Sequence, residues 1–155
     1  MATLTAITAG DWSDPYTWDA GGSPGGAGAS GVPGAGDVAD VAGYIVELDV
    51  DATVLQLTHL TAGYLNISED GRSFTATQAV NGIQAAGGGS GTLRVNLTGS
   101  ETCTINADIK NSSRGAALNI SGGIVNLTGD IAFHHTTSSS YAVRITGGTF
   151  NLTGD

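Results

Sequence analysis

Acidic residues at alternate positions are the first candidates for chemistry in this sequence. Glu47, Asp49 and Asp51 alternate along one predicted strand, and Asp37 and Asp40 precede them. Carboxylate oxygens are the ligands that Ca²⁺ prefers, so a structural calcium ion is one hypothesis for this cluster. The spacing fits no calcium-binding loop, and alternate acidic residues on a strand are more often a face turned to solvent. We therefore predict a solvated face and no metal site.

Histidine and cysteine residues do not add a reactive set. His134 and His135 are adjacent, so they cannot both face one side of a strand, and we expect them in an exposed loop. His59 has no evident partner. Cys103 lies in an alternating run of apolar and polar residues, where we expect it to be a small, buried core residue. A single cysteine also excludes an internal disulfide framework.

Catalysis on acidic polysaccharides needs carboxylates gathered on one strand face, or carboxylates beside Arg or Lys. Lys110 and Arg114 stand near Asp108, but nothing nearby completes such a constellation. The sequence therefore predicts no catalytic residue, no cofactor-binding residue and no metal ligand, and the expected protein is not an enzyme. A distal enzymatic part of a longer polypeptide stays open as an alternative.

Several Asn residues begin the triplet Asn-x-Ser/Thr, which is the acceptor pattern for N-glycosylation. Their regular placement inside predicted strands favours another cause, in which outward Asn side chains stack on one another in successive repeats. The triplets begin at Asn66, Asn96, Asn111, Asn119, Asn126 and Asn151.

Composition limits the partners. The formal net charge is -9, and the basic residues are spread singly, so nucleic acid and anionic membranes are poor partners. No signal peptide is visible at the N-terminus, and no apolar run approaches the ~18 residues of a membrane span. The few basic residues are Arg72, Arg94, Lys110, Arg114 and Arg144.

The chain divides into three predicted zones. Residues 1–20 carry two Trp and a Tyr in a turn-rich frame, which predicts a small aromatic cap with its own satellite core and an attachment role. Residues 21–36 are rich in Gly, Ala, Ser and Pro and predict a loop or linker. Residues 37–155 change to short alternating strands separated by Gly, Asp and Asn, and we expect this part to continue beyond residue 155.

A repeat identifies the expected fold. The pattern apolar-Asn-apolar-Ser/Thr occurs five times, and residues 120–130 match residues 145–155 at eight of eleven positions, at an offset of 25. Offsets of about 20–30 residues are typical of one coil of a solenoid. Because side chains alternate along a strand, the apolar residues should face inward, and a Gly-Gly corner should lead into the next strand. We predict an all-β, right-handed parallel β-helix of the pectin-lyase type; the alternative is an antiparallel β-sandwich or jelly roll.

The repeat stops at Thr153-Gly154-Asp155 without the atypical cap that usually closes a solenoid. The expectation is therefore that the chain is the leading part of a longer polypeptide, or that a partner chain covers the open end.

The opening of the chain resembles a module found at the start of β-helical regions in bacteriophage fibre and tailspike-like proteins and in bacterial surface proteins. The resemblance rests on the Trp pair in residues 10–18, the Gly-Pro-Gly-x-Gly-Asp-like turn in residues 31–37 and the strand through Leu48. It covers roughly residues 8–70, and the long insert at residues 21–30 departs from it. The resemblance implies a parallel β-helix on a phage appendage or capsid, commonly as a homotrimer, and it carries over no catalytic residue.

The expected function is that of a structural protein of a tailed bacteriophage virion: a tail fibre, a tailspike or a capsid decoration protein. Such a protein would be assembled in the host cytoplasm and displayed on the virion surface. Its expected partners are other copies in a homotrimer, other virion proteins of the head or tail through the N-terminal segment, and a glycan of the host surface. The alternatives are a bacterial surface adhesin or carbohydrate-binding module, and the front part of a polysaccharide depolymerase.

Overall fold

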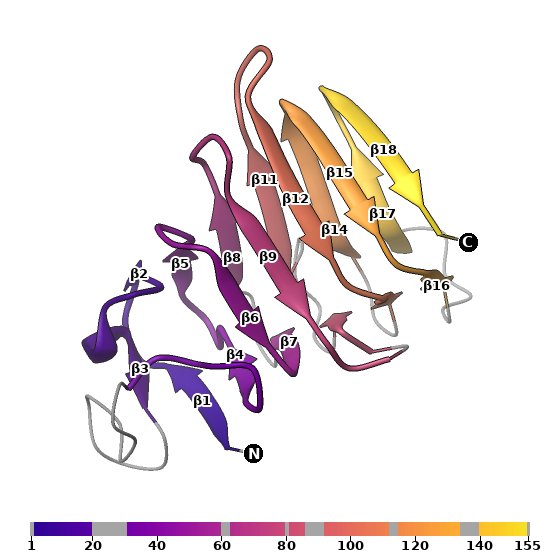
Figure 1. Ribbon diagram of the computed structural model, residues 1–155. Helices are drawn as coiled ribbons and strands as arrows, with labels where there is room; N and C mark the ends of the chain where they lie inside the picture. Colours follow the sequence, from indigo (N-terminus) through magenta and orange to yellow (C-terminus); the bar gives the residue numbers. More distant parts are fainter. Residues whose placement is uncertain are drawn as a thin grey trace.

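Short β-strands make up most of the described part of the chain, and they lie side by side from the N-terminal end to the C-terminal end (Figure 1). A short 3-10 helix, η1 (Pro15–Thr17), lies near the start. The all-β prediction is confirmed. The computed structural model describes residues 2–19, 31–59, 63–79, 81–85, 92–111, 115–133 and 140–154.

Three sheets contain the strands, here named A, B and C. Within each sheet the neighbouring strands are parallel, except that β1 and β3 of sheet A pair antiparallel. Sheet A contains, in chain order, β1 (Thr3–Ala6), β3 (Trp18–Asp19), β4 (Val38–Asp40), β7 (Gln56–His59), β10 (Ile83–Ala85), β13 (Ile109–Asn111) and β16 (Ile131–Phe133).

Sheet B contains β2 (Gly10–Asp11), β5 (Ile45–Glu47), β8 (Tyr64–Ile67), β11 (Leu93–Asn96), β14 (Gly115–Gly122) and β17 (Ser140–Ile145). Sheet C contains β6 (Ala52–Val54), β9 (Ser73–Ala76), β12 (Thr102–Asn106), β15 (Ile124–Thr128) and β18 (Thr149–Thr153).

From β4 onward the chain visits the sheets in a fixed order. Each set of three consecutive strands contributes one strand to sheet A, one to B and one to C, and we call this set a circuit. Each strand then pairs with the strand three places later, as β5 does with β8 and β8 with β11. Parallel pairing between successive circuits is expected of a stacked repeat and not of an antiparallel sandwich.

The last two circuits follow the predicted offset of 25 residues. Ile120 pairs with Ile145 in sheet B, and the whole of β15 pairs with β18 in sheet C at the same offset. A glycine corner joins the two sheets at Gly123, whose φ is +75°. A Cβ atom there would lie 2.4 Å from Leu97 Cβ, so only glycine fits this corner without a shift of its neighbours.

Apolar side chains fill the interior as columns that run from circuit to circuit. Each fully buried Leu, Ile or Val contributes about 1.5–3 kcal/mol to stability relative to an exposed one. The sheet A column consists of the buried residues Leu4, Ala39, Leu57, Ile83 and Ile109, and the matching sheet B column of Val46, Leu65, Leu93 and Leu118.

The aromatic residues near the N-terminus belong to this same interior. Trp12 and Trp18 are buried and meet edge to face, with ring centroids 4.9 Å apart, and Trp12 also contacts Phe74 of β9 at 5.9 Å. The expectation of a separate satellite core is wrong, because both Trp side chains pack into the main apolar cluster. Tyr16 instead lies at the surface, in η1, where Asp14 caps the helix by accepting a hydrogen bond from the Tyr16 N–H.

Some predictions fall on residues outside the described part of the chain. These are the loop or linker over most of residues 21–36, the loop position of His134 and His135, the role of Arg114, and the missing cap at Asp155. The described residues contain no helix that is long and apolar enough to cross a membrane.

Candidate functional site

The acidic residues singled out above do not converge on one point. Glu47 accepts hydrogen bonds from the Asn66 side chain at 2.8 and 3.1 Å. Asp49 binds the N–H of Ser13 at 3.0 Å and its hydroxyl at 2.5 Å. Asp51 accepts from the Ser73 N–H at 2.9 Å. These carboxylates therefore connect neighbouring circuits.

Asp37 and Asp40 each accept a hydrogen bond from a backbone N–H group. Asp37 accepts a hydrogen bond from the Ala2 N–H at 2.9 Å, and Asp40 accepts one from the Ala42 N–H at the same distance. Asp40 is buried, so it does not belong to the solvated face that the sequence predicts. Among the described residues, no group of three or more His, Cys, Asp and Glu side chains is arranged to hold a metal ion.

Cys103 lies on β12 in the interior, as predicted. Burial raises the pKa of its thiol to about 12, so the thiol stays protonated and unreactive at neutral pH. Asp108 accepts a hydrogen bond from the Asp130 N–H at 2.9 Å, again between circuits. Lys110 lies on β13, in register with Gln84 of β10 and Ala132 of β16.

The predicted stacking of Asn on Asn holds in sheet C. Asn151 donates a hydrogen bond to Asn126 Oδ1 at 2.9 Å, in register across β15 and β18. Sheet B departs from the prediction, because Arg94 stands between Asn66 and Asn119.

The reason for this departure is a two-residue shift. Leu93-Arg94-Val95 pairs with Leu65-Asn66-Ile67, so Arg94, and not Asn96, is the equivalent of Asn66. Its inward and outward alternation is as expected, since Val95 and Leu97 are buried and Asn96 is exposed. Alternation alone repeats every two residues, and a shift of two therefore leaves the pattern unchanged.

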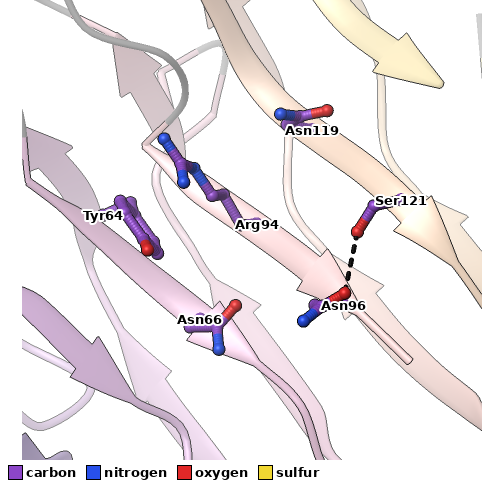
Figure 2. Close-up of a pocket in the computed structure, with 6 residues that line it drawn as sticks. All are labelled: Tyr64, Asn66, Arg94, Asn96, Asn119 and Ser121. Carbon is purple, nitrogen blue, oxygen red and sulfur yellow. Dashed lines mark hydrogen bonds between the residues drawn. The ribbon is translucent and has the colours of Figure 1, made fainter. Parts of the chain in front are cut away.

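A hollow of about 320 Å³ lies on the outer face of sheet B, across β8, β11 and β14 (Figure 2). Such a volume is at the small end of the range of ligand-binding pockets. The hollow combines one positive charge, one aromatic ring, three amides and a hydroxyl. Its described lining residues are Tyr64, Asn66, Arg94, Asn96, Asn119 and Ser121.

Arg94 is held in a defined position in this hollow. Its guanidinium carbon lies 3.6 Å from the centroid of the Tyr64 ring, which is the geometry of a cation–π contact. Stacking engages the flat face of a guanidinium, whereas its N–H donors lie in the plane of the group. The contact with Tyr64 therefore orients the plane in which Arg94 can donate hydrogen bonds.

Neighbouring side chains also orient two of the amides. Glu47 accepts both hydrogen bonds from Asn66 Nδ2, and in Figure 2 the Asn66 oxygen is directed toward the strand that carries Arg94 and Asn96. The Ser121 hydroxyl donates to Asn96 Oδ1 at 3.1 Å and to the Val95 carbonyl at 3.0 Å. Asn66 thus presents an acceptor, and Asn96 presents its NH₂ donor.

Chemically, this arrangement can bind but offers little for catalysis. The described lining side chains supply hydrogen bonds and a positive charge, and they include no carboxylate, imidazole, amine or thiol that could act as a general base or nucleophile.

A second hollow, of about 260 Å³, lies where the ends of β9, β12 and β15 meet the following corners. Its only charged described residue is Asp108, whose carboxylate already accepts a hydrogen bond from the Asp130 N–H. Its described lining residues are Ala76, Thr77, Gln78, Ala79, Asn106, Ala107, Asp108 and Thr128.

The sheet B hollow was not predicted from the sequence, in which Arg94 stands as an isolated cation. The runs Leu65-Asn66-Ile67 and Leu93-Arg94-Val95 share an apolar-polar-apolar pattern, but their pairing in register follows only from the structure. Comparison of the chain with protein-family models, with curated proteins and with solved structures finds no match.

Proposed function

We propose that the chain is a right-handed parallel β-helix that forms a rigid, structural part of a tailed bacteriophage virion, as a fibre, spike or decoration protein. The observation that carries the proposal is the order of the strands, in which every third strand returns to the same sheet in parallel register. Parallel crossovers within one sheet are right-handed in about 98% of cases, which favours the right-handed form.

The surface chemistry agrees with a structural role. Outward Asn, Ser and Thr side chains form hydrogen bonds from circuit to circuit, as Asn126 does with Asn151. Carboxylates add further bonds between circuits, as Asp51 does with the Ser73 N–H. A repeat in which each unit is bonded to the next resists local opening and can be lengthened by adding units. These are the properties that a displayed rod needs.

The N-terminal module supports the assignment to a virion. Its Trp pair packs into the first circuits, and the residues that carry the resemblance to phage fibre and tailspike-like proteins lie here. We propose that this end attaches to other head or tail proteins and that the chain assembles as a homotrimer.

Immunogold labelling tests the location. Antibody raised against the chain should label tailed particles released from the host that carries the gene, at one place on the head or tail. Label on intact bacterial cells, with none on particles, would contradict the proposal and favour an adhesin.

Light scattering during size exclusion tests the assembly. For a sample of the 155-residue chain, of 15.4 kDa, the expected mass is that of three copies. A stable monomer at micromolar concentration would contradict the trimer.

A carbohydrate-binding module is the second candidate. The hollow on sheet B favours it, because Arg94, three Asn and Ser121 supply hydrogen-bonding groups on an outer face. The two candidates are compatible if a virion protein also contacts a host glycan, and the labelling experiment separates virion from cell-surface display.

A further inference from the structure

The outer face of sheet B carries one row of side chains whose charge changes from end to end. The row follows the register of the strands, so each member lies about 4.8 Å from the next. It begins with a carboxylate and ends with two guanidinium groups separated by an amide. In order, its members are Glu47, Asn66, Arg94, Asn119 and Arg144.

This row concentrates positive charge in an acidic chain. The net charge is -9 with only five Lys and Arg, and Arg94 and Arg144 lie on the same row. Arg72 lies away from this row and forms an ion pair with Glu69 on its own stretch of chain. A local positive potential on an otherwise acidic surface attracts anionic groups to that place.

The amides complete a set of complementary groups around Arg94. On the neighbouring part of the hollow, Asn66 presents its oxygen from β8, and Asn96 presents its NH₂ from β11. Asn119 Oδ1 is buried and accepts no hydrogen bond from the described residues. A buried polar atom without a partner marks a place where a ligand group or a water molecule would complete the bonding.

We propose that this hollow binds an acidic saccharide, with the carboxylate of a uronate or sialate on Arg94 and sugar hydroxyls on the amides. Arg binds carboxylates through paired N–H donors in one plane, and stacking on Tyr64 orients that plane. Amide and hydroxyl groups can both donate and accept, as sugar hydroxyls do.

The same features disfavour other ligands. An apolar peptide or lipid would need a mostly apolar lining, whereas Tyr64 is the only aromatic or aliphatic residue among those described around the hollow. A nucleic acid would need several cations to neutralise successive phosphates, which a chain of net charge -9 does not supply.

The assignment of an acidic saccharide to the hollow rests on the proposed surface display, because a cell-surface glycan must be able to reach the hollow.

Calorimetric titration with a panel of short acidic saccharides tests the proposal. The panel contains oligogalacturonate, a glucuronate-containing oligosaccharide and a sialylated oligosaccharide, each beside a version with its carboxylates reduced to alcohols. At least one acidic member should bind with a Kd near or below about 1 mM, and its reduced version about tenfold or more weakly. Absence of binding across the panel, or equal binding of the reduced versions, overturns the proposal.

Substitutions locate the binding. Arg94→Gln should weaken binding about 10- to 100-fold, and Arg94→Lys should restore only part, because the charge returns without the planar fork. Asn119→Asp changes little volume but places a negative charge beside the ligand carboxylate, and it should weaken binding by at least about tenfold. Unchanged affinity in Arg94→Gln overturns the assignment.

Matched controls keep the result specific. Arg72→Gln removes an Arg outside the hollow, and Asn126→Asp makes the same acidic change on sheet C; both should bind as the unaltered chain does. Polyglutamate of similar charge should bind more weakly than the best saccharide, and equal binding overturns the saccharide assignment. Light scattering on Arg94→Gln separates the two proposals, because loss of binding with an intact trimer concerns the hollow alone.

Discussion

The aromatic region before the first circuit and the last circuit differ in how far their apolar side chains are buried. Near the N-terminus, large aromatic side chains fill the interior, and Trp12 and Trp18 are at most 1% exposed. In the last circuit, the strands follow their predecessors residue for residue, but Ile145 and Leu152 are 48% and 41% exposed. Burial of large side chains therefore contributes more to the first region, and backbone pairing contributes relatively more to the last circuit.

The repeat provides its own matched pairs for this comparison. Leu127 and Leu152 occupy the same register position one circuit apart, and they are 1% and 41% exposed. The residue type and the backbone pairing are the same, so the two positions differ mainly in burial.

The largest expected effect is at the aromatic end. Trp12→Ala should lower the free energy of unfolding by about 3–5 kcal/mol, because it empties the space between Trp18 and Phe74. Tyr16→Ala, at an exposed site four residues along the chain from Trp12, should change it by less than about 0.5 kcal/mol. Urea denaturation followed by circular dichroism measures both, and similar values for the two variants would contradict a core role for Trp12.

The matched leucines should give the next largest difference. Leu127→Ala should cost about 2–5 kcal/mol, because a buried cavity forms within the column between Ile105 and Leu152. Leu152→Ala in the 155-residue chain should cost less than about 1 kcal/mol, since much of its side chain already contacts water. Equal losses in thermal and urea denaturation would show that burial does not distinguish the two circuits.

How far the sequence predicts this molecule follows from the same contrast. The alternation of apolar residues correctly placed Leu65, Ile67, Leu118 and Ile120 in the interior. The offset of 25 residues correctly placed Ile145 beside Ile120, because no insertion separates these circuits. In regular circuits, both the buried residues and the strand register can therefore be predicted from local sequence patterns.

The strand register between irregular circuits cannot be predicted in this way. The corners differ in length, so Val38 pairs with Gln56 in one step, while Phe74 pairs with Ile105 in another. Which strands stack is then decided by packing of the whole interior rather than by the local pattern. Arg94 was missed for this reason, since its place in the hollow depends on pairing with Asn66.

Glycine corners give an intermediate effect that tests the regular circuits. Gly123 and Gly71 have nearly equal positive φ values, +75° and +77°, so both disfavour a side chain by a similar amount. A Cβ atom at Gly123 would lie 2.4 Å from Leu97 Cβ. A Cβ atom at Gly71 would meet no atom within 4 Å other than those of the residues next to it in the chain. Gly123→Ala should therefore cost about 1–3 kcal/mol more than Gly71→Ala in urea denaturation. Equal costs would mean that the corner relaxes freely.

The smallest expected effect concerns a carboxylate near the aromatic end. Burial alone would raise the pKa of Asp49, but hydrogen bonds from the Ser13 hydroxyl and N–H, with help from the charge of Arg72, outweigh it and lower that pKa. A carboxyl group with a lowered pKa in the folded state stabilises the protein above its unfolded pKa, and this contribution is lost as the pH falls through the folded pKa.

Asp49→Asn should therefore lower the free energy of unfolding at pH 7 by less than about 1 kcal/mol, because the site is largely exposed to solvent. The difference from the unaltered chain should shrink as the pH falls below 3.8, the ordinary value for this group. Ser13→Ala should remove part of the same pH dependence, since it deletes the hydroxyl donor. Urea denaturation at pH 7, 5 and 3 measures these differences. A difference that stays constant through this range would assign the contribution of Asp49 to packing rather than to its charge.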